Sequence, residues 1–370
     1  MKYVDEFRDQ QHAFAIAKAI TQEARSEHHY RLMEFCGGHT HAIFRYGVQD
    51  LMPPNVEFVH GPGCPVCVLP IARLDQAMQM VEQHQLILCS YGDMLRVPGG
   101  KRRSLLQAKA DGADIRMIYS TQDALTCARD NPRQQVVFFA IGFETTTPPT
   151  AVAIKQAEAE GLTNFSVLCN HVLTPAALGA ILNADEPLNI DAFLGPSHVS
   201  TIIGSKPYEQ FAEKYQKPIV IAGFEPLDVM QSALMAIRLL NEGRSVVENE
   251  YTRAVTPEGN IKAQALMNEV FETRESFEWR GLGFIPESAL QIKQEFSQFD
   301  AEKRFAVETQ AVMDNKACEC PAILRGQKKP MDCKLFGTVC TPENPMGSCM
   351  VSSEGACAAY WSYGRFRVVA

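Results

Sequence analysis

Several features that would assign a chain to a class by themselves are missing from this sequence of 370 residues. It has no dense stripe of Lys and Arg, and its formal net charge is -8, so its acidic surface would repel phosphate backbones and nucleic-acid binding is not expected. The most apolar runs, such as VVFFAIGF, fall far short of the roughly 20 residues that cross a bilayer, so no membrane span is expected. The first residues, MKYVDEFRDQ, lack the apolar core of a signal peptide, and we therefore expect a cytoplasmic protein.

Cysteine, by contrast, is abundant. The chain has 12 cysteines, and a reducing compartment disfavours a framework of structural disulfides. Metal binding or redox chemistry is the better explanation for so many thiols. The length and the apolar content of 46% allow a sizeable core and favour two or three domains.

Short apolar runs alternate with helical patterns through the first 224 residues. Each run ends in glycine or polar turn residues and precedes a candidate helix, such as SLLQAKADGAD, which is typical of β-α units around a parallel sheet. The first set of runs is RLMEFC, VEFVHG, LILCSYG and IRMIYS, and the second is VVFFAIG, FSVLCNH, AFLGPSH and IVIAGFE.

The two sets resemble each other in their turns, which predicts an internal duplication. GPGCP is echoed by GPSHV, and LCSYGDML by IAGFEPLD. We therefore predict an α/β fold with two similar parallel-sheet lobes that face a cleft, into which the loops at the carboxyl ends of the strands point. The alternative is one long doubly wound sheet in which the similarity of the turns is coincidental.

These patterns divide the chain into four segments. Residues 1–30 form an N-terminal helical segment that packs on a third domain, residues 31–125 form the first lobe, and residues 126–224 form the second. Residues 225–370 form a third, mostly helical and irregular portion that loses strand character. Its end is rich in Cys, Gly and Pro, and we expect it to fold around a metal centre because it cannot fill a core by itself.

The first motif with chemical potential is EFCGGHTH. Cys36 follows an apolar strand and precedes two glycines, which let a ligand or another backbone approach the sulfur, and His39 and His41 follow in the same loop. Thiol and imidazole groups bind iron, zinc or copper, and a nearby histidine lowers a thiol pKa. The alternative is a buried strand-end cysteine beside residues that only cap a helix.

The second motif is HGPGCPVCVLP, in which Cys64 and Cys67 form a C-x-x-C pair at a helix start. Such a pair can cycle between dithiol and disulfide or bind a metal through both sulfurs. A mixed zinc site that adds Cys36 and His39 is the alternative.

The third motif is IGFETTTPPT, where Glu144 is a candidate proton carrier beside three threonines. Capping of the helix that the two prolines open is the simpler use of the threonines. GPSHVS, with His198, adds to the same polar rim, although a lone histidine is more often structural.

The C-terminal segment holds the densest group of thiols in the chain. Six cysteines lie within forty residues, with Gly and Pro between them, and this predicts a metal site; the six are Cys318, Cys320, Cys333, Cys340, Cys349 and Cys357. The spacing alone does not choose between zinc and an iron-sulfur cluster. The remaining cysteines, Cys89, Cys127 and Cys169, are predicted to be small buried hydrophobic residues.

Together these motifs resemble the HypD family of hydrogenase maturation factors, which assemble the iron centre of nickel-iron hydrogenases. The resemblance covers nearly the whole chain and rests on long, rare strings: CGGHTHAIF, VEFVHGPGCPVCVLP, SLLQAKA, GFETT, HVS, AGFEPLD, EWRGLG and VSSEGACAA. It implies two similar α/β lobes and a third portion with a [4Fe-4S] cluster. The cluster ligands it implies are Cys320, Cys333, Cys340 and Cys357, while Cys318 and Cys349 fall outside the family pattern.

The resemblance also implies a function. Cys36, Cys64 and Cys67 would lie in the cleft, where an iron receives cyanide and carbon monoxide. Cys36 and a thiol of a partner would bind the iron, and Cys64 and Cys67 would act as a redox pair. His39, His41 and Glu144 would orient groups or carry protons there. The implied partners are a small HypC-type chaperone, a cyanide-delivering HypE-type factor and, indirectly, the hydrogenase large subunit.

Two other functions remain open. In a thiol-disulfide oxidoreductase, Cys64 and Cys67 would reduce a substrate with electrons from the cluster, and no iron centre would be built. A zinc-stabilised interaction module would contain no acid-labile sulfide.

Overall fold

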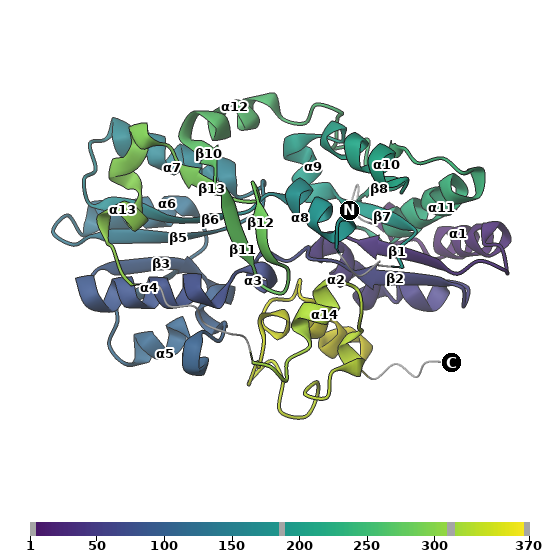
Figure 1. The fold of residues 1–370 in the computed structure, drawn as a ribbon, viewed down its shortest axis with the longest axis horizontal. Coiled ribbons are helices and arrows are strands. Elements are labelled where there is room, and N and C mark those ends of the chain that lie inside the picture. The colour runs from purple at the N-terminus through teal and green to yellow at the C-terminus, as the bar shows by residue number, and fades with distance from the viewer. Residues whose placement is uncertain (1–4, 185–188, 309–314, 366–370) are drawn as a thin grey trace.

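Two parallel β-sheets lie side by side in the computed structural model, which describes residues 5–184, 189–308 and 315–365 (Figure 1). Sheet A has the strand order β2-β1-β7-β8-β9, and its strands are β1 (Tyr30–Glu34), β2 (Val56–His60), β7 (Ala192–Pro196), β8 (Ile219–Ala222) and β9 (Val247–Asn249). Sheet B has the order β4-β3-β5-β6, with β3 (Ile87–Tyr91), β4 (Ile115–Ile118), β5 (Val136–Gly142) and β6 (Phe165–His171). All ladders within both sheets are parallel, which confirms the predicted α/β class.

Helices cover both faces of each sheet, so the strands are largely buried even where they carry polar residues. Every residue of β5 and of β6 is buried. Around sheet A pack α1 (Gln10–Glu23), α2 (Gly37–Tyr46), α9 (Ser197–Ile203) and α11 (Pro226–Glu242); around sheet B pack α4 (Ile71–His84), α5 (Leu105–Ala110), α6 (Thr121–Asp130) and α7 (Thr147–Ala159). The shorter or connecting helices are α3 (Pro65–Val68), α8 (Thr174–Leu182), α10 (Glu209–Tyr215), α12 (Ile261–Val270), α13 (Ala301–Arg304), α14 (Cys320–Leu324) and α15 (Ala356–Ala359).

Local sequence explains where several of these helices begin. Ser104 and Ser120 each form a capping box, in which the serine hydroxyl accepts from the backbone N–H three residues on and that residue's side chain bonds back. Helix α11 ends at Gly243, which adopts a left-handed conformation with φ 68°. These signals are readable in the sequence, and α5 occurs within the run SLLQAKADGAD, as predicted.

The strands group differently from the predicted lobes. Each sheet takes two strands from residues 31–125 and two from residues 126–224, because β3 and β4 pair with β5 and β6, whereas β1 and β2 pair with β7 and β8. Sheet B, from Ile87 to His171, is thus inserted between two parts of sheet A. One pair of similar turns, GPGCP and GPSHV, follows β2 and β7 of sheet A, whereas the other pair follows β3 of sheet B and β8 of sheet A. The similarity of the turns therefore does not indicate which strands pair.

The region after residue 225 completes sheet A and bridges to sheet B. Helix α1 packs along α11, where Arg238 pairs with Glu23 at 3.0 Å, and β9 adds an edge strand to sheet A. The prediction that this region loses strand character is wrong, because β9 and four further strands lie in it. Two antiparallel pairs follow: β10 (Phe271–Thr273) with β13 (Leu290–Ile292), and the hairpin of β11 (Ser276–Trp279) and β12 (Gly283–Pro286).

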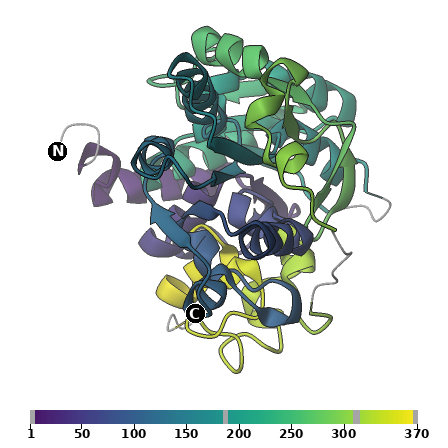
Figure 2. The ribbon, with the colours of Figure 1, turned by 90° about the vertical axis from the view of Figure 1, so that its left-hand side faces the viewer.

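The described part of the C-terminal segment, residues 315–365, consists of short helices and turns on one side of the molecule, opposite α12 (Figures 1 and 2). It is tied to both sheets. Lys329 pairs with Glu57 of β2 at 2.6 Å, and the Arg96 guanidinium, just after β3, donates to the Val351 carbonyl at 2.9 Å. Among the described residues, no helix combines the length and apolar character that crossing a bilayer requires.

Candidate functional site

Cys36 lies at the carboxyl edge of sheet A, between the point where β1 ends and α2 begins. The chain runs from β1 to β2 on one side and resumes with β7 on the other side of β1, so the strand order reverses between β1 and β7. Such a switch point leaves a crevice beyond the strand ends, where open α/β sheets bind their ligands. Cys36 follows β1 and His198 follows β7, so these residues flank that position.

A buried carboxylate organises the loop around Cys36. Glu34 is fully buried at the end of β1, and its carboxylate accepts a hydrogen bond from the Cys36 backbone N–H at 3.0 Å. The same group accepts from the Thr40 hydroxyl and lies 2.8 Å from His60 Nδ1. Because Glu34 ends β1 and its partners lie at the start of α2, within α2 and at the end of β2, it fixes the three elements against one another. The sequence interpretation did not single out Glu34.

The Cys36 sulfur faces the first turns of two helices. The backbone N–H groups of Gly38 in α2 and His198 in α9 hydrogen bond to the thiol, which favours the thiolate. Burial outweighs them, and together with the nearby Glu354 carboxylate it raises the pKa of Cys36 to about 12. Cys36 is therefore a protonated thiol until a cation approaches it.

Cys64 and Cys67 form a disulfide across the short helix α3, with their Cα atoms 5.2 Å apart. Both are buried. The loop before them presses against the Cys36 loop: a Cβ at Gly63 would lie 2.5 Å from both the Cα and the N of Cys36, and Gly37 N–H donates to the Gly63 carbonyl at 3.1 Å. Glycine at position 63 thus brings the C-x-x-C pair and Cys36 into adjacent loops.

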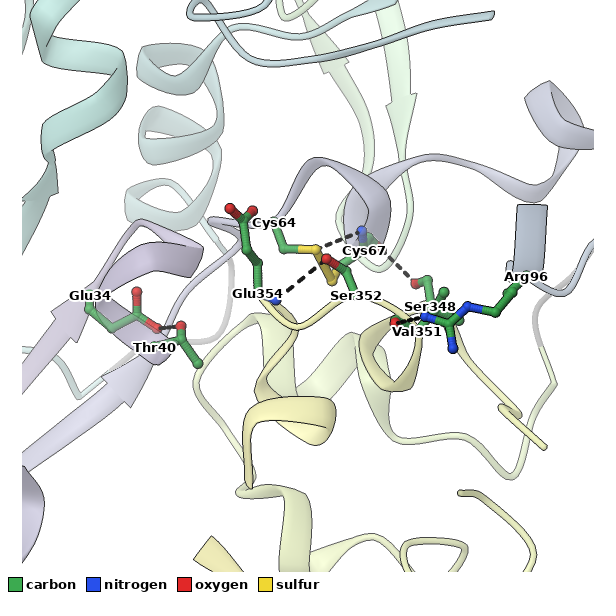
Figure 3. The surroundings of a disulfide bond; sticks show 9 residues. All are labelled: Glu34, Thr40, Cys64, Cys67, Arg96, Ser348, Val351, Ser352 and Glu354. Atoms are coloured by element: carbon green, nitrogen blue, oxygen red, sulfur yellow. Dashed lines mark hydrogen bonds between the residues drawn. A yellow bond between two sulfur atoms is a disulfide. The ribbon is translucent and has the colours of Figure 1, made fainter. Parts of the chain in front are cut away.

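The C-terminal segment closes over these two loops (Figure 3). The Ser348 hydroxyl donates to the Cys67 carbonyl at 2.9 Å, which ties the segment to α3. Further along, Glu354 packs so closely on α2 that a Cβ at Gly37 would collide with its side chain. Burial, with added repulsion from Asp93 and Glu34, raises the pKa of Glu354. Glu354 is a second carboxylate near Cys36 that the sequence interpretation missed, although it lies within the VSSEGACAA string.

His39 and His41 point in different directions. His39 is fully buried, its Nε2 lies 2.9 Å from the Ala222 carbonyl of β8, and burial lowers its pKa, so it is a neutral ring that donates to that carbonyl. His41 is partly buried, and its ring packs edge-on against Tyr363 of the C-terminal segment at 5.1 Å between centroids. Both histidines are close to Cys36 in the sequence, but in the structure each ring contacts a different element.

A cavity of about 350 Å³ opens beside the first turns of α2. Its walls include Gly38, His41, His198, Phe224 and Glu354. His198 stacks on Phe224 at 3.8 Å between ring centroids, and burial lowers the pKa of His198 to about 4, so this wall is neutral and aromatic. Cys36 does not itself line the cavity, but Gly38, His198 and Glu354 line it and also interact with the Cys36 thiol.

Glu144 lies on sheet B, just after β5, and is almost fully buried. Its two oxygens accept from the backbone N–H and the hydroxyl of Thr174, both at 2.9 Å, and burial raises its pKa to about 7. The buried Tyr208 interacts electrostatically with both Glu144 and Cys36. The adjacent threonines do not cap α7 as expected: Thr146 and its neighbour donate to backbone carbonyls instead.

The C-terminal thiols gather into a group that is buried except for Cys318, which is partly exposed. The thiol of Cys320 hydrogen bonds with Cys318 and with Cys357, and Cys340 interacts electrostatically with the first two. The Cys340 sulfur also accepts from the Met346 N–H at 3.4 Å. Cys333 is buried in the same core.

The chemistry of these donors fits a thiolate-bound cluster. A Cβ at Gly347 would lie 2.6 Å from the Cys318 sulfur and 2.7 Å from the Cys320 sulfur, so only glycine leaves the space beside these thiols open. Among the described residues, no three Cys, His, Asp or Glu side chains stand as a ready metal site. The donor types and the open space fit, while the geometry of four ligands is not assembled.

A buried thiol at a sheet switch point, an adjacent disulfide and a cysteine-rich segment folded over both define a thiol-based α/β protein. A family model named HypD, with the description "Hydrogenase formation hypA family", matches residues 11–364. The chain belongs to this family of hydrogenase maturation factors.

Relatives of known name align with this chain over nearly their full length. The chain is 63% identical to the hydrogenase expression/formation protein HupD of Azotobacter chroococcum mcd 1, with 100% of this chain and 99% of that protein covered. It is 63% identical to the hydrogenase maturation factor HypD of Azotobacter vinelandii, with 99% and 98% covered, and 45% identical to HypD of Escherichia coli strain K12, with 98% of each covered.

Proposed function

We propose that this chain is a scaffold on which an iron ion acquires cyanide and carbon monoxide ligands during maturation of nickel-iron hydrogenases. The observation that supports this most strongly is the position of Cys36. It is a buried sulfur that faces two helix N-termini at a sheet switch point, beside a cavity and a disulfide. A finished iron group must leave for the hydrogenase, and a single scaffold thiolate, completed by a partner thiol, suits transient binding better than a closed cage.

The iron enters as cargo and changes the protonation of the site. Cys36 has a pKa of about 12, so the thiol must lose its proton when the cation binds. Glu354, which raises that pKa and is itself partly buried with a raised pKa, is the proton acceptor we assign. Glu34 is already occupied by three donors and holds the loop in place.

The remaining site residues take supporting roles. Cys64 and Cys67 act as a redox pair that accepts two electrons and two protons when the disulfide is reduced. His39 orients α2 against β8, and His41 and Glu144 are the candidate proton carriers at the cavity wall and on sheet B. Cys320, Cys333, Cys340 and Cys357 would hold a [4Fe-4S] cluster, which supplies electrons one at a time when bound.

The partners we propose are a HypC-type chaperone that contributes the second thiol and a HypE-type factor that delivers cyanide. The hydrogenase large subunit receives the iron with its cyanide and carbon monoxide ligands, and this assembly takes place in the cytoplasm. Membership of the maturation family supports this assignment.

The test is Cys36→Ala in the full chain, purified with its chaperone. The infrared bands of iron-bound cyanide and carbon monoxide should disappear, because no other described thiol occupies the switch point. Cys169→Ala, which removes a buried thiol on β6, is the matched control and should keep the bands. Bands at full strength in Cys36→Ala would refute the assignment.

A second function is favoured by one observation, the disulfide between Cys64 and Cys67. A thiol-disulfide oxidoreductase would use this bond to reduce a protein substrate. It would contain iron only in the cluster and a titratable disulfide, whereas the scaffold also holds iron with diatomic ligands. Metal and sulfide analysis with infrared spectroscopy separates the two, and also identifies a zinc module by the absence of sulfide.

A further inference from the structure

Sheet B contains a second pair of thiols that the proposed function does not use. Cys89 lies in β3 and Cys127 in α6, and the two thiols hydrogen bond to each other. The prediction that both are buried hydrophobic residues is correct for Cys89, which has no exposed surface, and wrong for Cys127, which is partly exposed. Solvent can therefore reach one member of the pair and not the other.

The guanidinium of Arg116 lies beside this pair of thiols. Arg116 lies directly opposite Cys89 in the parallel ladder between β3 and β4, and its Nη1 lies 3.4 Å from the Cys127 sulfur. Asp114 holds the same guanidinium through two hydrogen bonds of 2.9 and 2.8 Å. Asn131 Nδ2 approaches the sulfur at 3.8 Å. Two donors thus converge on the sulfur of a partly exposed cysteine, an arrangement that stabilises a thiolate.

The electrostatics divides the pair into two roles. The hydrogen bond from Cys89 and then the charge of Arg116 lower the pKa of Cys127 to about 7, against burial and the Asp114 charge. The same hydrogen bond and burial raise the pKa of Cys89. Cys127 is therefore the nucleophile, and Cys89 keeps its proton until Cys127 has reacted.

We propose that Cys127 is an oxidation site for a small peroxide and that Cys89 resolves it to a Cys89–Cys127 disulfide. The Cys127 thiolate attacks one peroxide oxygen and the O–O bond breaks, giving a sulfenic acid and, with one proton, water. The Cys89 sulfur then attacks the Cys127 sulfur, its proton leaves with the sulfenic hydroxyl as a second water, and the S–S bond forms. Two thiols lose two electrons in total, and hydrogen peroxide gains them.

This site is separate from the iron site. It lies on α6 and β3 of sheet B, whereas Cys36 and the Cys64–Cys67 disulfide lie at the edge of sheet A. Its behaviour therefore does not depend on the proposed scaffold function. A disulfide here would join α6 covalently to the sheet that it covers.

The experiment treats the full-length protein with hydrogen peroxide and measures each cysteine by differential alkylation and peptide mass spectrometry. Wild type should yield a Cys89–Cys127 cross-linked peptide that is two hydrogens lighter than the separate peptides. Cys89→Ser should accumulate a sulfenic acid on Cys127 that dimedone traps, and Cys127→Ser should leave Cys89 unmodified. Cys169 is an internal control: burial raises its pKa to about 11, and it should stay reduced.

Arg116→Gln separates a tuned thiol from one that is merely exposed. The variant should react about threefold more slowly at neutral pH, and the midpoint of the pH profile for Cys127 alkylation should move up from about 7. An unchanged midpoint in Arg116→Gln would overturn the proposal. So would oxidation of Cys127 no faster than that of Cys169, or dimedone trapping without any cross-linked peptide in wild type.

Discussion

Substituting alanine for Gly63 should disable the site while leaving the fold intact. The added Cβ would lie 2.5 Å from backbone atoms of Cys36, and ordinary contact begins at 3.4 Å, so the loop that carries Cys64 must retreat by about 0.9 Å. Neither side of this contact is a flexible side chain, so rotation of a rotamer cannot relieve it. A misplacement of about 1 Å between reacting groups costs on the order of 100-fold in rate.

The assay is hydrogenase activity in cells whose own copy of this gene is deleted and replaced by the variant, at matched protein levels. Gly63→Ala should lower activity by about 100-fold. Gly92→Ala is the control, because its Cβ would meet only the flexible Met117 side chain, at 3.1 Å, and it should stay within about twofold of wild type. Full activity in Gly63→Ala, with the protein folded, would show that the contact between the two loops does not position the chemistry.

Two further predictions concern carboxylates. Burial raises the pKa of Glu144 from 4.5 to about 7, so the folded chain retains a proton that the unfolded chain loses; stability should fall as pH rises through this window, by up to about 3 kcal/mol. Glu144→Gln, whose amide oxygen can still accept from the Thr174 N–H while its amide nitrogen donates to the Thr174 hydroxyl, should flatten this part of the pH profile in chemical denaturation, and parallel profiles would contradict the reasoning. Glu354→Gln removes a negative charge that raises the pKa of Cys36, so alkylation of Cys36 should begin at lower pH than in wild type; an unchanged profile would remove Glu354 from its assigned role.

The elements of this fold are readable from the sequence, but their pairing is not. Runs such as VVFFAIG form strands because buried parallel strands need apolar side chains on both faces, and that property is local. Whether LILCSYG pairs with its sequence neighbour VEFVHG or with VVFFAIG depends on contacts between distant residues. The ladder that joins Cys89 to Phe138 shows which alternative the chain adopts.

The site shows the same limit. Cys36, Cys64 and Cys67 can be singled out because sulfur chemistry is rare and the motifs are local. Glu354 approaches Cys36 only because the C-terminal segment folds back over α2, and no local pattern near either residue indicates this contact. The pairing of Cys127 with Arg116 likewise depends on the packing of α6 over the β3–β4 edge.

The insertion of sheet B within sheet A sets an order for synthesis. Strands β3 to β6 are contiguous, so sheet B can form as soon as it leaves the ribosome, while β1 and β2 wait for roughly 130 more residues before β7 is made. At about 5–20 residues per second, that delay lasts roughly 7 to 26 seconds. During this time the Cys36 loop has only one of its flanking strands, β2, and the nascent chain exposes an apolar edge that β7 later covers. The thiol centre is therefore completed late, after its neighbouring sheet is already folded.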